Sequence, residues 1–63
     1  MPAVSSSAIS SIDYDDESED MTVYFFRGGV YVYSGVPKDV YEEFINAGSV
    51  GSYFYYNIRN VYG

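Results

Sequence analysis

Acidic side chains are the groups best able to bind a metal or move a proton in this 63-residue chain, and six of the nine lie within residues 13–20. Counted from Asp13, acids occupy positions one, three and five of an EF-hand calcium loop. The pattern then fails, because Ser18 stands where the sharp turn needs Gly and Tyr24 where a bidentate Glu is needed. We therefore predict that residues 13–20 form a solvated turn or loop and not a metal site.

Catalytic chemistry has few side chains to draw on, since the chain contains neither His nor Cys. That composition excludes disulfides, a thiolate, a conventional nucleophile–base pair and the usual zinc or haem ligands. The pair Gly28-Gly29 is no phosphate-binding loop, because it joins two strand-like runs and does not open a helix. We expect no enzymatic activity and no cofactor.

Aromatic residues make up 21% of the chain, with nine Tyr and four Phe. A tyrosine combines a large apolar body with a polar tip, so it suits both cores and binding faces. Tyr24, Tyr31 and Tyr33, with Arg27 and Arg59, could stack on and contact a single-stranded nucleic acid. The formal charge of −6 comes from residues 13–20, since the other three acids balance three bases. So few bases argue against strong non-specific nucleic-acid binding.

These side chains must be positioned by a β-hairpin over residues 21–37, where two aromatic-rich runs flank Gly28-Gly29. A two-residue turn at the glycines would place Phe25 opposite Val32. We prefer a three-residue loop, residues 27–29, which places Phe25 opposite Tyr31. A less regular strand is expected over residues 8–14.

The preferred register aligns Val23, Phe25, Tyr31 and Tyr33 on one face. The opposite face would carry Tyr24 and Phe26 with Val30 and Val32; the other register would replace the two valines with Tyr31 and Tyr33. Both faces of the hairpin are therefore apolar in either register. Two helices are sufficient to cover only one face of so small a sheet. The other face is predicted to bind a second copy or a partner, unless the N-terminal residues cover part of it.

Two helices are expected after the hairpin. Pro37 suits a helix start, and Val40, Tyr41, Phe44 and Ile45 recur at helical spacing. Ser49 can cap a second helix, whose predicted apolar stripe is Val50, Phe54, Ile58 and Val61. The fold class is α+β: a three-stranded antiparallel meander followed by two helices packed on one face of the sheet.

The ordered set of strand and turn residues resembles the KTSC family, a domain named for its place at the C-terminus of some lysyl-tRNA synthetases and also found in free bacterial or phage proteins. The residues that carry the resemblance are Ser6-Ser7, Ile9, Ile12, Tyr14-Asp15, Met21, Val23, Phe25, Gly28-Gly29-Val30-Tyr31, Tyr33, Gly35-Val36-Pro37, Val40-Tyr41, Ser49, Gly51, Tyr53-Phe54 and Ile58-Arg59. The resemblance implies RNA binding from the synthetase context. Ser52 and Tyr55 depart from the basic residue and the Asn that family members commonly carry there.

We interpret residues 1–7 as a flexible tail and residues 8–63 as a single KTSC-like domain. The function expected is a non-catalytic interaction module that binds a protein partner, itself, or both through an aromatic sheet face. Alternatives are a single-stranded RNA or other nucleic-acid binder and a phage-encoded inhibitor of a bacterial defence complex. The expected binding residues are Tyr24, Phe26, Arg27, Tyr31, Tyr33 and Arg59. No run is long enough to span a membrane, and we expect a cytoplasmic protein.

Overall fold

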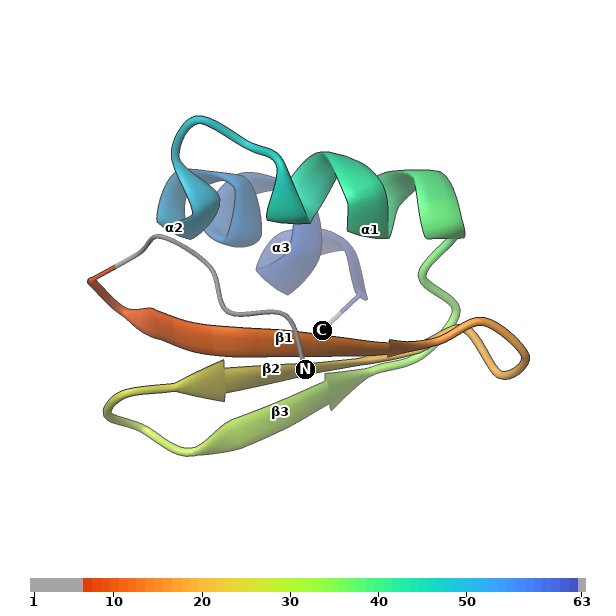
Figure 1. The fold of residues 1–63 in the computed structure, drawn as a ribbon, viewed down its shortest axis with the longest axis horizontal. Helices are drawn as coiled ribbons and strands as arrows, with labels where there is room; N and C mark the ends of the chain where they lie inside the picture. Colours follow the sequence, from red (N-terminus) through yellow and green to blue (C-terminus); the bar gives the residue numbers. More distant parts are fainter. Residues whose placement is uncertain (1–6, 63) are drawn as a thin grey trace.

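A computed structural model describes residues 7–62, which form a three-stranded sheet with helices on one of its faces (Figure 1). The prediction for the segment of residues 1–7 falls almost entirely outside the described residues. The strands are β1 (Ile9–Asp15), β2 (Asp20–Phe25) and β3 (Val30–Tyr33), paired antiparallel in the order β1-β2-β3. The predicted α+β meander with helices on one face is therefore confirmed.

The β2–β3 register differs from both predicted alternatives. Val23, not Phe25, lies opposite Tyr31, and Tyr24 lies opposite Val30. The Phe25 N–H donates to the Gly29 carbonyl at 3.0 Å, and Gly28 and Gly29, each with positive φ, belong to the connection. The preferred register is wrong by two residues, a shift that leaves every side chain on its predicted face. The hydrophobic pattern determines only that alternation, so it could not distinguish the two pairings.

The acidic segment contributes more to the strands than the predicted loop would. Residues 16–19 form the turn, whereas Asp15, the last residue of β1, pairs with Asp20, the first residue of β2. The Asp15 carboxylate accepts the Glu17 N–H at 2.9 Å, and its carbonyl accepts the Glu19 N–H at 2.8 Å. The prediction of a loop across residues 13–20 is wrong at both ends, because a hairpin needs only four residues to reverse direction here.

Helix α1 (Lys38–Ile45) follows Pro37, whose carbonyl accepts the first helical N–H bonds. The second helical stretch is continuous and has three parts: α2 (Val50–Tyr53), the π-helical η1 (Phe54–Arg59) and α3 (Asn60–Tyr62). Ser49 caps α2, its hydroxyl accepting the Ser52 N–H at 3.4 Å. The predicted cap and the predicted second helix are both present.

The wide π turn alters which side chains of the second helix reach the core. Val50 and Ile58 are buried, and Phe54 and Tyr62 pack against the core, but Val61 is 63% exposed. The predicted place of Val61 in the apolar stripe is wrong because π turns contain more residues than α turns. The stripe therefore continues at Tyr62, four residues after Ile58.

The core lies between the sheet and the helices. Its members come from all three strands, from both helices and from Val36 before α1; they are Ile9, Ile12, Met21, Val23, Tyr33, Val36, Phe44, Val50 and Ile58. Tyr14 closes one end of it, stacked on Tyr41 at 4.6 Å with its hydroxyl donating to the Val36 carbonyl at 2.6 Å. One face of the sheet thus packs against the core, and the other face lies at the surface.

Candidate functional site

No described element covers the face of the sheet away from the helices (Figure 1). This face carries exposed apolar side chains. Phe26 is 65% exposed, Val30 56% and Val32 60%. Tyr24 lies half-buried among them, opposite Val30 in the sheet. We call these four residues the open face. A solvated antiparallel sheet normally presents polar residues on such a surface, so a cluster of large apolar groups indicates an interaction surface.

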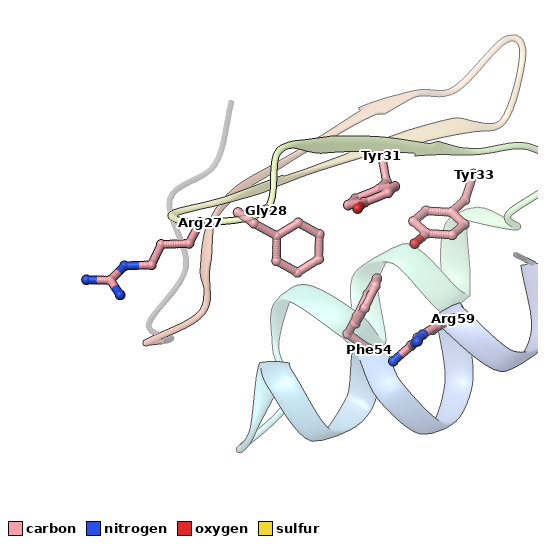
Figure 2. A pocket seen from close by; sticks show the side chains of 7 residues that line it. Arg27, Gly28, Tyr31, Tyr33, Phe54 and Arg59 are labelled. Carbon is pink, nitrogen blue, oxygen red and sulfur yellow. The ribbon is translucent and has the colours of Figure 1, made fainter.

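A pocket of about 360 Å³ lies on the helix side, between β3 and η1 (Figure 2). Phe25 forms edge-to-face contacts with Tyr31 at 5.6 Å and with Phe54 at 5.2 Å between ring centroids. Phe54 also meets the ring of Tyr33 edge-on at 5.8 Å. This volume is in the range that accepts small molecules or a single side chain. The pocket can therefore offer flat aromatic surfaces to a ligand.

Both arginines of the chain border this pocket. Figure 2 shows the Arg27 side chain extending away from the aromatic rings, whereas Arg59 lies beside Phe54. The Arg59 guanidinium carbon is 5.7 Å from the ring centroid of Tyr55. Within residues 7–62 the ion pair that forms uses Lys38 and Asp16, at 3.8 Å, and neither arginine. The two guanidinium groups thus remain available to an anion.

The Tyr33 hydroxyl borders the pocket as a neutral group. Burial raises the pKa of Tyr33 most, the neighbouring Tyr31 raises it further, and the positive charge of Arg59 opposes these effects. A neutral phenol can donate or accept a hydrogen bond. The pocket therefore combines apolar rings, hydroxyls and cationic groups at its margin.

The six predicted binding residues fall on two surfaces. Tyr24 and Phe26 belong to the open face, while Arg27, Tyr31, Tyr33 and Arg59 line the pocket. The structure adds Phe25, Gly28 and Phe54 to the pocket. Phe25 could have been found from the sequence, because it shares a face with Tyr31 and Tyr33. The sequence pattern predicts Phe54 as part of the core stripe, and only its position beside β3 shows that it also lines a cavity.

The acidic turn brings no metal-binding cluster together in the described part of the chain. The Asp15 carboxylate is oriented instead by the turn's own N–H groups, and the Asp16 carboxylate by Lys38. Within residues 7–62, no helix is long and apolar enough to cross a membrane.

Together, the fold and the two surfaces define a small α+β domain with one covered and one open sheet face. The model of the KTSC domain matches residues 5–62, and the chain belongs to the KTSC family. It is 36% identical to an uncharacterized protein of Stutzerimonas stutzeri (strain A1501) over 82% of this chain and 73% of that one. A protein of Tsukamurella paurometabola is 34% identical over 84% of this chain and 79% of its own length.

The crystal structure of a KTSC domain protein from Yersinia pestis superposes on this chain with a TM-score of 0.94. The two sequences are 35% identical, and the match covers 98% of this chain and 87% of the other. Family membership therefore rests on both sequence and backbone.

Proposed function

We propose that this protein is a non-catalytic interaction module that binds a protein, either a partner or a second copy, through the open face. The observation that carries the proposal is the exposure of Phe26, Val30 and Val32 on the sheet face that the helices leave uncovered. Covering two aromatic side chains per copy would contribute roughly several kcal/mol at about 25 cal/mol per Å² of apolar area. That is comparable with the total stability of a domain this small.

The test is the double substitution Tyr24→Ser and Phe26→Ser, with Tyr55→Ser and Tyr56→Ser as the matched control. The control pair is also aromatic and exposed, at 48% and 69%, but it lies on η1. Sedimentation measures self-association, and capture from a native bacterial lysate, with and without nuclease, measures partner binding. We expect the open-face variant to stay folded and lose the binding that uses the open face, while the control retains it.

The contrary outcome is a wild-type protein that is monomeric and captures nothing, together with an open-face variant that unfolds. Tyr24 and Phe26 would then be structural residues. Circular dichroism of both variants separates loss of binding from loss of fold.

Single-stranded nucleic acid is a second candidate ligand, favoured by the pocket alone. Tyr31 supplies an aromatic ring on which a base could stack, and Arg59 supplies a guanidinium group for phosphate contact. Ser52 stands where family members commonly carry a basic residue, so the positive charge available for such binding is reduced, which is why this candidate ranks second.

A further inference from the structure

Among residues 7–62, no strand pairs with the outer edge of β3. Strand order places β1 and β3 at the two margins of the sheet. The β1 margin has the usual protection, with a bulge between Ile9 and Ser11 and the carboxylates of Asp13 and Asp15. By contrast, β3 reads Val-Tyr-Val-Tyr, with neither a charge nor a proline, and its first three residues are exposed. Such an edge is a template for another strand.

The register shows which backbone groups of β3 face outward. Bonded and non-bonded pairs alternate along an antiparallel ladder, and Phe25 donates to Gly29. Counting from that bond, Tyr31 and Tyr33 direct their N–H and C=O groups toward β2. Val30 and Val32 therefore direct theirs toward the free edge. The edge offers two donors and two acceptors, two residues apart.

Charge is divided between the two ends of this edge. The β2–β3 connection carries Arg27, whereas the acidic turn, residues 16–19, lies at the end where β3 finishes. The Val36 N–H donates to the Glu19 carbonyl at 3.1 Å, which fixes that turn beside the segment following β3. If β3 of a second copy paired antiparallel with this strand, the Arg27 end of each copy would lie beside the acidic turn of the other.

We propose that two copies of this chain pair edge to edge through β3 about a two-fold axis, forming a six-stranded sheet. Val30 of each copy lies opposite Val32 of the second copy, and these outward residues exchange hydrogen bonds. Tyr31 lies on the axis, opposite Tyr31 of the second copy. This register uses all four outward groups of both strands, whereas registers centred on Val30 or Val32 leave part of the strand unpaired.

The same arrangement places Arg27 of one copy opposite Gly35 of the other, near its Glu19. An isologous contact duplicates every interaction, so this attraction occurs twice. The pairing adds a second interaction surface to the open face of the proposed function. It also joins the two open faces into one continuous apolar surface that remains accessible to a partner.

A single cysteine at the axis tests the proposal, since the chain has no thiol of its own. Residues in a non-hydrogen-bonded antiparallel pair have Cα atoms about 4.5 Å apart, within disulfide range. Under mild oxidation, Tyr31→Cys should therefore form a covalent dimer rapidly and nearly completely. The control is Tyr55→Cys, because Tyr55 is 48% exposed and Tyr31 is 51% exposed. Equal cross-linking of the two variants would overturn the proposal.

Sedimentation of the thiol-free protein gives a second, independent reading. Tyr31→Lys places two like charges opposite each other on the axis and should yield the 7.1 kDa monomer, while Tyr55→Lys stays dimeric. Arg27→Glu should weaken the dimer, and adding Glu19→Arg should restore it. A monomeric wild type, or a Tyr31→Lys variant that sediments like the wild type, would refute edge pairing.

The open-face variant separates this proposal from the function proposed above. If Tyr24→Ser with Phe26→Ser abolishes self-association while Tyr31→Lys does not, copies meet through the open face and edge pairing is wrong. If only Tyr31→Lys does so, the edge holds the dimer and the open face must be tested for a different partner.

Discussion

Two tyrosine hydroxyls make side-chain hydrogen bonds between segments that are distant in the sequence. Tyr14 donates to the carbonyl of Val36, and Tyr53 donates to a carboxylate oxygen of Glu43 at 2.9 Å. Tyr53 joins the two helical stretches in this way, and its ring also stacks near that of Phe44. Each phenol thus couples packing to a polar contact.

The Tyr53 phenol predicts a loss of stability at alkaline pH. Burial and the hydrogen bond to Glu43 raise the pKa of Tyr53 to about 12, against 10.0 for a free tyrosine. The neutral phenol is favoured in the folded state, so its contribution is fully present below pH 10 and is lost as pH rises toward 12. Urea unfolding should show that the free energy of unfolding falls less steeply between pH 10 and 12 in Tyr53→Phe than in the wild type. Parallel curves would contradict the assignment.

At the scale of elements, the π-helical η1 is the part of the fold that departs most from expectation. Extended π-helical stretches are rare and often occur near functional sites. Here the Asn60 side-chain amide donates to the Tyr55 carbonyl at 2.8 Å, satisfying an acceptor in the widened helix. The widening directs Ile58 and Tyr62 inward and leaves Arg59 beside the pocket.

Two alanine substitutions test this helical geometry. Ile58→Ala removes a fully buried side chain and should cost about 2–5 kcal/mol of unfolding free energy. Val61→Ala, at an exposed position, should change stability by less than about 0.5 kcal/mol. Chemical denaturation of the two variants measures the difference. A Val61→Ala cost near that of Ile58→Ala would mean that the helix continues as a regular α-helix with Val61 in the core.

The charge of the whole molecule is distributed unevenly, with acidic and basic groups at different ends. Its longest dimension is 28 Å, and the acidic turn and Arg27 belong to opposite ends of the sheet. At physiological salt, charges are screened over about 8 Å, so the potential near the arginines depends little on the distant acids. Lys38 is engaged with Asp16, which leaves Arg27 and Arg59 as the cationic groups at the pocket.

This distribution predicts weak binding of single-stranded nucleic acid, no tighter than roughly the high-micromolar range at physiological salt. Two phosphate contacts would give a slope of log K against log salt of about −1.4, and Arg59→Ala should reduce its magnitude by about 0.7. Fluorescence anisotropy with a short oligonucleotide measures both. Sub-micromolar affinity at that salt would instead favour nucleic-acid binding as the main function.

The sequence was sufficient for the order of the elements and for the two faces of residues 21–26, whereas the face of each β3 residue depended on the length of the loop before it. Successive side chains of a strand point to opposite faces. Every register that differs by an even number of residues therefore keeps Val23, Phe25 and Tyr33 on one face and Tyr24 and Val32 on the other. The role of Ser49 as a helix cap could also be predicted from the local sequence, since a cap depends on the next three residues.

Only the tertiary structure determined what each of those faces packs against. The hairpin register, the π turn that replaces Val61 with Tyr62, and the pocket all depend on contacts between segments distant in sequence. Arg27 and Arg59 are 32 positions apart, and both border one pocket because the second helix packs across β3. A local pattern specifies which side of an element is apolar. The element's rotation and register are set by the partner it packs against, because close packing admits few arrangements of large aromatic side chains.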